Sequence, residues 1–410
     1  MFDELPPELT TGERIRIIRE RRGLTRKVLA GLVGRSEDWL KKIENGDREL
    51  RSITHFVRLA HALHVPNVAV LTGDELSIPT NPVGKLSHAS VPNIRAAMHG
   101  ASFSGTPTFG VETPERLRGR VDAAWKLWHT SAHQRTEVGG ILPALLQDAH
   151  ASIRGHSGDD RRAAHAATAD LYRLVQRHLA HICEPELYWL AVDRGRAHSE
   201  EADDPLSLAS AAWSLAIGQR ASGYPDEAIR SDEAGIALIG DRLDEGPDYV
   251  GMFGALHLQA ATSAGLDGRG GDAARYLDEA DRIAERLPHG YSHPMSAFDS
   301  GNVGVHSVSV GVGLMTPGDA LRAAEDVDPE TIPSLERRSR LFLDIAAGHV
   351  QRGEAAAAVH YLSRAHKTSP EGVRYVPMAR GVARDLVNVA RGPLKSDAVA
   401  LAEEIGAKAA

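Results

Sequence analysis

The sequence contains a single cysteine, Cys183, in 410 residues, and aromatic residues make up only 5% of it. One cysteine excludes a disulfide framework within the chain and a zinc site built from cysteines. No apolar run approaches the ~18 residues that cross a membrane, and no basic-then-apolar signal begins the sequence. We therefore expect a soluble protein of the reducing cytoplasm that does not enter a membrane.

Patterns typical of enzymes are also missing. The 20 histidines show no metal-ligand spacing beside a carboxylate, and no nucleophile is accompanied by a base. The glycine-rich residues 268–271 do not follow a strand, so we interpret them as a turn between helices and not as a phosphate-binding loop. We expect no enzymatic activity, no metal and no cofactor.

The formal net charge is −8, but the charge is unevenly distributed. Residues 1–73 contain 13 Lys and Arg against 10 Asp and Glu, so this part carries +3 and the remainder −11. A basic head on an acidic body indicates a head that meets nucleic acid and a larger part with another task. The length suggests two or three domains, because single cores stop growing at ~250–300 residues.

Residues 26–45 have the pattern of a helix, a sharp turn and a second helix. Ala30 is small enough to let the second helix cross the first closely, and Gly34 can take the positive φ of a sharp helix exit. Leu40 and Ile43 lie three residues apart, so they share the inner face of the second helix and leave its outer face free. This spacing predicts a helix-turn-helix.

Helical spacing continues on both sides of this motif, at residues 13–22, 52–63 and 68–71, which completes five short helices. The arrangement resembles the lambda-repressor-like, XRE-type DNA-binding domain. The resemblance rests on Arg19, Gly23-Leu24-Thr25, Leu29-Ala30, Gly34, Ser36 and Ile43-Glu44-Asn45-Gly46. It implies an internal ion pair between Arg19 and Glu44.

The resemblance also implies that the helix after Gly34 enters the major groove of DNA with its N-terminus first. Lysines there can donate to guanine, and acids can accept from cytosine. In an alternative interpretation, Glu37 and Asp38 only stabilise the start of the helix through its dipole, which leaves specificity to the lysines. The DNA-binding residues implied are Arg26, Ser36, Glu37, Asp38, Lys41, Lys42, Asn45, Arg48 and Arg51.

Composition changes after the head. Residues 76–118 are rich in Pro, Ser, Thr and Gly, which predicts a linker with a short helix at 91–99 inside it. This linker joins a DNA-binding domain at 1–75 to a helical domain at 119–410, where Ala and Leu predominate and period-two alternation is rare.

The helical domain contains an internal repeat. In each unit a glycine that ends one helix is followed after five residues by an alanine, and after seven more by another small residue. The units are Gly223, Ala228 and Gly235; Gly268, Ala273 and Ala280; Gly353, Ala358 and Ala365; and, more weakly, Ala320 with Val327. They resemble tetratricopeptide repeats, although the spacing exceeds the usual ~34 residues.

The predicted fold class is therefore all-α, with a five-helix lambda-repressor-like DNA-binding domain joined by a linker to a tetratricopeptide-like α-solenoid. The order of parts resembles actinobacterial XRE-type regulators with a C-terminal repeat domain. For the body this resemblance implies a sensing or partner-binding role.

Polar residues inside the repeat domain are candidates for ligand contacts. Asn302 and His306 lie four residues apart in 299–314, a segment rich in Gly and Val with poor helix propensity. Packing must hold such a helix, so its inner polar groups need partners, which are either a ligand or neighbouring polar groups. The candidate ligand-binding residues are His257, Asn302, His306 and Arg340.

These patterns predict a sequence-specific, DNA-binding transcriptional regulator whose repeat domain receives a peptide, small-molecule or protein effector. The alternative is a protein-interaction adaptor whose helix-turn-helix no longer binds double-stranded DNA. We expect a homodimer, because one head of this size reads only about four to six base pairs. The amphipathic helix with Trp125 and Trp128 is a candidate for the dimer contact, unless these tryptophans cap the repeat stack.

Overall fold

The structure is a computed structural model that describes residues 6, 9–50, 53–63, 65, 68–73, 86–100, 111–182 and 184–407. Within these residues the regular elements are all helices and no strand occurs, so the all-α prediction is confirmed. The chain divides into two compact units, Met1–Val83 and Gly84–Ala410, which we call the head and the body.

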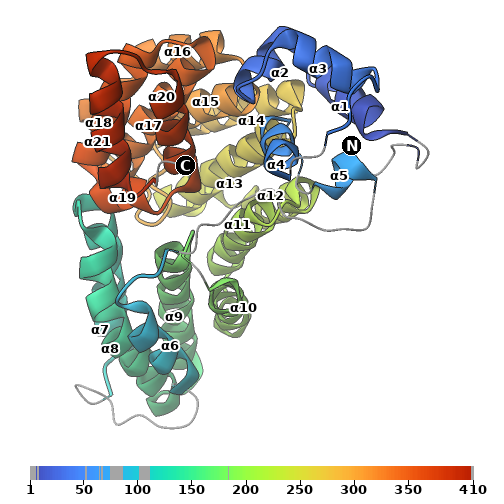
Figure 1. Cartoon of the computed structure of the whole chain (residues 1–410). Coiled ribbons are helices and arrows are strands. Elements are labelled where there is room, and N and C mark those ends of the chain that lie inside the picture. The colour runs from blue at the N-terminus through green and yellow to red at the C-terminus, as the bar shows by residue number, and fades with distance from the viewer. Residues whose placement is uncertain are drawn as a thin grey trace. The chain divides into compact units, whose positions relative to one another are not determined.

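The described part of the head has five helices, as the sequence predicts (Figure 1). They are α1 (Thr11–Arg21), α2 (Arg26–Leu32), α3 (Glu37–Glu44), α4 (Ile53–Ala62) and α5 (Ala69–Thr72). The hydroxyls of Thr10, Thr25 and Ser36 cap α1, α2 and α3 by accepting from a backbone N–H three residues further on. Each cap satisfies an N–H that has no partner inside its helix, which fixes where the three helices begin.

Two glycines set the geometry of the helix-turn-helix. Gly34 has a φ of 70°, the left-handed conformation that ends α2 sharply, as its position in the sequence predicts. Gly12 lets α1 approach α3, because a Cβ at this position would lie 2.2 Å from the carbonyl oxygen of Ile43. Ile15 and Leu40 are fully buried in the resulting core.

A buried carboxylate joins the first three helices of the head. Glu44 on α3 accepts from Arg19 Nε on α1 at 2.6 Å and from Arg26 Nε on α2 at 2.6 Å. The Glu44 side chain is fully buried, and that of Arg19 is 7% exposed. The predicted ion pair between Arg19 and Glu44 is therefore present, with Arg26 as a second partner.

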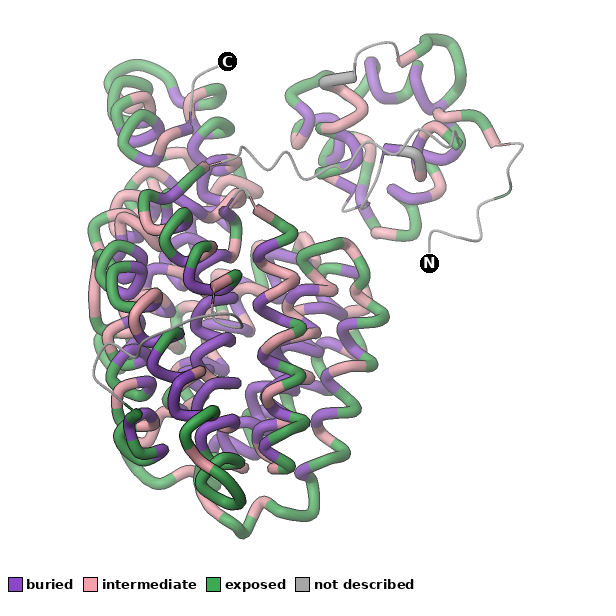
Figure 2. The backbone as a smooth tube through the Cα atoms, turned by 90° about the horizontal axis from the view of Figure 1, so that it is seen from below, coloured by how far each residue is buried: buried purple, intermediate pink, exposed green. Residues whose placement is uncertain are grey.

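The body is built mainly from consecutive helix pairs, in which each helix packs on the next (Figure 1). The pairs are α9 (Gly158–Leu179) with α10 (Pro185–Ala202), α11 (Pro205–Ala221) with α12 (Pro225–Ile239), α13 (Pro247–Leu266) with α14 (Gly270–Ala284), α15 (Ser300–Gly313) with α16 (Pro317–Glu325), and α17 (Leu335–Arg352) with α18 (Ala355–Thr368). The first helices of successive pairs also contact one another, so they form an inner layer. Figure 2 shows buried residues along the facing sides of neighbouring helices.

Other helices flank these pairs. They are α6 (Val91–Gly100), α7 (Pro114–Thr130), α8 (Gln134–Gly155), α19 (Pro370–Arg374), α20 (Pro377–Val389), α21 (Pro393–Ile405) and the short 3-10 turns η1 (Leu243–Glu245) and η2 (Pro329–Thr331).

The repeat units predicted from the sequence are helix pairs in the structure. Gly223, Gly268 and Gly353 all have positive φ, between 78° and 88°, at the turns inside their pairs. The alanine five residues after each glycine is fully buried. Gly235 provides space, because a Cβ there would lie 2.9 Å from Leu256 on the next helix. Small residues therefore allow the helices to pack closely. The pair α9 and α10 extends the array beyond the units found in the sequence.

The end of the array contacts its beginning. α17 packs on α7, and α19 packs on α8 (Figure 1). The Glu371 carboxylate on α19 accepts from the backbone N–H groups of Arg135 and Thr136 at the start of α8, at 2.8 and 3.0 Å. Arg177 on α9 donates to Glu336 on α17 at 3.1 Å. The inner layer is therefore closed by polar contacts between helices far apart in the sequence.

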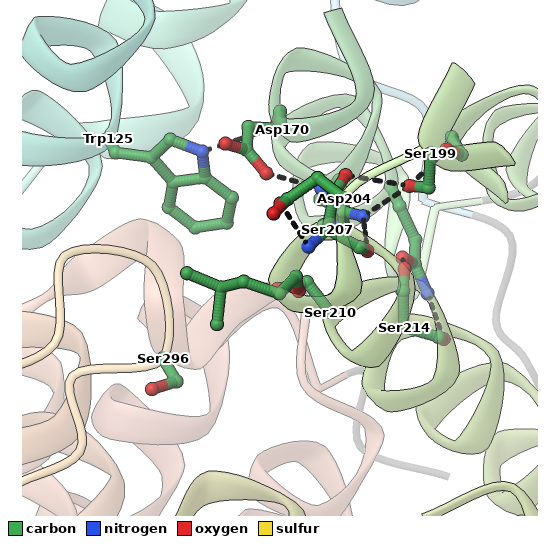
Figure 3. A network of polar contacts seen from close by, with 12 residues as sticks. Trp125, Asp170, Ser199, Asp204, Ser207, Ser210, Ser214 and Ser296 are labelled. Atoms are coloured by element: carbon green, nitrogen blue, oxygen red, sulfur yellow. Dashed lines mark hydrogen bonds and ion pairs between the residues drawn. The ribbon is translucent and has the colours of Figure 1, made fainter. Parts of the chain in front are cut away.

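A buried polar network joins α7, α9, α10 and α11 (Figure 3). The indole N–H of Trp125 donates to the carbonyl oxygen of Asp170 at 3.1 Å. Arg173, with a side chain only 1% exposed, pairs with the Asp170 carboxylate and donates to the Ser199 hydroxyl and the Ser207 carbonyl at 2.6 Å each. These bonds satisfy a buried charge and fix the order of the helices around it.

Two expectations about the region after the head are wrong. The helix at 91–99 was expected inside a linker, but α6 packs on α8 and buries Ile94 and Met98 completely in the core of the body. Trp125 and Trp128 are only 1% and 2% exposed in the same core, so they are not free to form a dimer contact. Their large apolar surface is already covered within one chain.

We predict that Glu44→Ala lowers the free energy of unfolding of the head by about 3–5 kcal/mol, because it leaves two arginines without their shared carboxylate. The double variant Arg19→Met/Glu44→Leu should lose less than the sum of its single changes. Urea unfolding of the fragment 1–73, followed by circular dichroism, measures both. The control Glu37→Ala, on the exposed side of α3, should cost under ~1 kcal/mol. Equal losses for Glu44→Ala and Glu37→Ala would contradict the prediction.

Candidate functional site

The two faces of α3 have opposite characters. Trp39, Leu40, Ile43 and Glu44 are buried against the rest of the head. From Arg35 to Arg48 the exposed residues are Arg35, Ser36, Glu37, Asp38, Lys41, Lys42, Asn45, Gly46, Asp47 and Arg48. Seven of these are predicted DNA-binding residues, and all seven are exposed on α3 or directly beside it. Arg51, also predicted, lies outside the described residues.

Asp38 and Lys42 are paired on the exposed face of α3. The ammonium of Lys42 lies 2.7 Å from the Asp38 carboxylate, one helical turn away. The hydrogen bond from Lys42 lowers the pKa of Asp38, with a smaller contribution from its charge. A phosphate or a base that approaches Lys42 must compete with this carboxylate. Lys41 has Glu37 at the same i−4 spacing.

A shallow, open hollow of about 370 Å³ adjoins the start of α3. Its lining consists of Gly31, Gly34, Arg35, Ser36, Asp38, Trp39, Lys42 and Arg48. Arg35 Nε donates to His55 Nε2 on α4 at 2.9 Å, and the Arg35 guanidinium lies 5.9 Å from the centre of the Trp39 ring. Three basic side chains therefore surround the exposed N-terminus of α3, where the helix dipole also attracts anions.

Arg35 was not among the DNA-binding residues predicted from the sequence. Its place between Gly34 and the N-cap Ser36 was the available signal, because a basic residue in this turn lies beside the helix N-terminus. Arg26, by contrast, was predicted to contact a phosphate and is held by Glu44, with its side chain 31% exposed. The Arg26 side chain therefore stabilises the head through its ion pair with Glu44.

The pKa of His55, which accepts a hydrogen bond from Arg35, is lowered by its surroundings. Burial lowers the pKa of His55, and the positive charges of Arg35, Arg58 and Arg48 lower it further. Only a neutral imidazole can accept the hydrogen bond from Arg35. Arg35 is therefore held in place while His55 is uncharged.

The four candidate ligand residues of the body divide into two places. Arg340 on α17 pairs with the buried Asp344, and its Nη2 donates to Ser309 on α15 at 3.2 Å. His306 bonds to Thr262 on α13 at 3.0 Å, and its pKa is well below the usual value because of burial and then of Arg337, Arg220 and Arg340. His306 and Arg340 therefore share one environment.

Asn302 shares the Ser296 carbonyl with Arg337, which acts on His306, whereas His257 is placed differently. Asn302 is 2% exposed and donates to the Ser296 carbonyl at 3.4 Å. His257 bonds to the Phe253 carbonyl at 2.9 Å within its own helix. The charges that lower its pKa after burial are those of Arg282 and Arg275 on α14, so it lies in another environment from His306 and Arg340.

The comparisons with known proteins address the head. Residues 11–71 match a family model described as a helix-turn-helix domain. This match runs from the start of α1 into α5 and supports a DNA-binding role for the head. The search of curated proteins gave no match to the chain, and the search of solved structures also gave none.

Two other features are absent from the described part of the chain. None of its helices is long and apolar enough to cross a membrane. Among the same residues, no three His, Cys, Asp or Glu side chains form a group that could hold a metal ion.

We predict that acidification lowers the free energy of unfolding of the head because it protonates His55. The pKa of His55 is lower in the folded head, so the unfolded chain takes up this proton first as the pH falls below ~6.5. The stability that neutral His55 supplies is complete above pH ~6.5 and is lost as the pH falls toward the folded pKa. Urea midpoints of the fragment 1–73 at pH 7.5 and 5.5 test this. His55→Gln, which keeps a neutral acceptor, should lose less on acidification, and equal losses would refute the prediction.

Proposed function

We propose that the protein is an XRE-type transcriptional regulator that binds specific DNA through α3 and receives an effector in its helical-repeat body. The observation that carries this proposal is the exposed polar face of α3, with Lys41 and Lys42, on a domain that matches a helix-turn-helix family. The body resembles tetratricopeptide arrays, and the whole resembles actinobacterial regulators of this kind. It acts by binding and not by catalysis.

The geometry of the head supports a specific division of roles. α3 enters the major groove with its N-terminus first, where Lys41 and Lys42 donate to guanine O6 and N7. Arg35 and Arg48, beside the hollow at the start of α3, bind phosphates and set the position of the helix. In this arrangement Asp38 holds Lys42 in place until DNA displaces the carboxylate.

The second candidate function is an adaptor whose head no longer binds DNA. The observation that favours it is the pair Glu37 and Asp38, which places two exposed carboxylates at the end of α3 that would approach phosphates. Selection of DNA fragments from a random pool, followed by a salt titration, separates the two. A regulator gives a selected sequence and an affinity that falls steeply with salt, whereas an adaptor gives neither.

We predict that Lys42→Ala weakens binding to the selected sequence by about 1–3 kcal/mol and relaxes the base preference. Fluorescence anisotropy with the selected sequence and a scrambled one measures both effects. The control Arg16→Ala removes one positive charge from α1, where Arg16 is exposed and paired with Glu20, and it should leave the preference unchanged. Equal loss of preference in both variants would contradict a role for Lys42 in reading bases.

Asp38→Asn separates the two interpretations of the acids on α3. If Asp38 only pairs with Lys42, the variant frees this lysine. Binding then becomes tighter on selected and scrambled DNA alike, and the salt slope grows by about 0.9 for the added phosphate contact. We expect this result because the Lys42 ammonium lies 2.7 Å from the Asp38 carboxylate. A loss confined to the selected sequence would instead assign Asp38 to a cytosine.

We also propose that the protein binds DNA as a homodimer, with two heads at half-sites ~34 Å apart. Mass photometry of the full chain, alone and with the selected DNA, should give two chains per DNA. A matched DNA with one half-site removed should lose most of the affinity. One chain per DNA with either fragment would overturn the dimer and leave DNA binding by the head intact.

A further inference from the structure

Arg35, Trp39 and His55 contact one another beside the hollow at the start of α3, although they come from three elements of the head. Arg35 lies in the turn before α3, Trp39 on α3 and His55 on α4. The Arg35 guanidinium donates to His55 Nε2 from Nε at 2.9 Å and from Nη2 at 2.7 Å. The centre of the Trp39 ring lies 5.4 Å from that of the His55 ring and 5.9 Å from the Arg35 guanidinium. We call these three residues the Arg35 cluster.

The hydrogen bonds of the Arg35 cluster require a neutral His55. An arginine side chain stays charged and has only N–H donors, so it cannot accept a hydrogen bond. His55 Nε2 must therefore carry a lone pair, which places the proton of the neutral ring on Nδ1. Protonation of Nε2 would remove the acceptor and put a second positive charge beside the guanidinium. The contact with Arg35 consequently exists only while His55 is uncharged.

The surroundings of His55 favour this uncharged form. The charged groups that act on His55, among the described residues, are Arg35 from the turn, Arg48 from the segment after α3 and Arg58 from α4 itself. Burial lowers the pKa of His55, and these three charges lower it further. Trp39, which is only 8% exposed, covers the imidazole from α3. The head therefore keeps most of its His55 neutral at pH 7, with Arg35 bound to it.

The bonds to His55 leave one end of the Arg35 guanidinium available for an anion. Arg35 Nη1 makes no hydrogen bond within the described residues, and Arg35 lines the open hollow of about 370 Å³ together with Lys42 and Arg48. Asp38, the carboxylate among the described residues of this lining, is paired with Lys42. Because Arg35 is exposed, its side chain would otherwise sample many rotamers. Fixing such a side chain in advance is worth about 2- to 12-fold in affinity.

We propose that His55 is a positioning residue for DNA binding, which in its neutral form holds Arg35 at the hollow for a DNA phosphate and on protonation releases it. His55 acts through Arg35 and not by its own contact with DNA. The inference rests on the proposed DNA-binding function of the head. It adds a residue of α4 to the binding machinery and makes the affinity for DNA depend on pH.

The sign of this pH dependence separates positioning from a simple effect of charge. A protonated histidine near DNA adds a positive charge, which strengthens binding to phosphates as the pH falls. Loss of the contact with Arg35 weakens binding over the same range, which begins below the ordinary histidine pKa of ~6.5 because the pKa of His55 is lowered. In Arg35→Gln only the effect of charge remains. The affinity of the wild type should therefore fall relative to that of Arg35→Gln as the pH falls.

The first test uses the full-length protein and the DNA fragment selected from the random pool, with anisotropy at pH 7.5. His55→Ala should weaken binding by about 2- to 12-fold in the wild-type background and by less than ~2-fold in Arg35→Gln, where the arginine that it holds is already gone. The matched control His61→Ala removes an exposed histidine from the same helix and should leave binding unchanged. Equal losses from His55→Ala in both backgrounds overturn the inference.

The second test repeats the titrations from pH 7.5 to 5.0, with circular dichroism to show that each variant is folded. His55→Gln supplies an amide oxygen that can accept from Arg35 and does not titrate. This variant should keep most of the affinity at pH 7.5 and lose the pH-dependent fall of the wild type. It also decides the matter if His55→Ala does not fold. Parallel pH profiles for the wild type and Arg35→Gln overturn the inference.

A measurement without DNA separates this inference from the proposed function. In full-length protein labelled with ¹⁵N-histidine, the NMR signals of His55 are those that disappear in His55→Gln. We expect a proton on Nδ1 and none on Nε2 at pH 7.5, and a proton on Nε2 overturns the inference whatever the DNA does. If the wild type selects and binds DNA but the two variants act independently, only the positioning role fails. If the expected tautomer is present and no DNA binds at any salt concentration, the proposed function fails, and the positioning role fails with it.

Discussion

The body depends on the contact between the two ends of its helical array. Helix pairs bury their apolar sides against neighbouring pairs, so an open array leaves its first and last members half covered. Here the carboxylate of Glu371 accepts from two N–H groups at the start of α8, and Arg177 pairs with Glu336 across the array. The ends therefore satisfy each other's polar groups. Because of this closure, side chains of α9, α11 and α17 act on the same buried groups.

In the head, one buried carboxylate joins the helices. Glu44 holds Arg19 and Arg26, and thereby the first three helices, from a fully buried position. Since the inner side of α3 is fixed in this way, its outer side carries no structural duty. The exposed Lys41 and Lys42 are then available for a partner. The buried core and the exposed polar surface of the head thus meet on two sides of one short helix.

The described part of the head keeps more buried or half-buried positive charge than negative charge. In the head, two arginines share the carboxylate of Glu44, and Arg26 remains 31% exposed. In the body, the guanidinium groups of Arg135 and Arg380 donate to backbone carbonyls. This positive charge suits the head to the phosphates of DNA, although the net charge of the chain is −8.

The sequence by itself determined the all-α class, the five helices of the head, the ion pair of Arg19 with Glu44, and the repeated helix pairs. Helix caps, positive-φ glycines and apolar spacing act over a few residues, so they can be recognised from the sequence alone. Only the tertiary structure decided that α6 and Trp125 belong to the core of the body, and that Arg177 meets Glu336 159 residues later in the chain. These contacts depend on how the whole array curves and closes. That curvature is the sum of many small packing angles, and no local pattern encodes it.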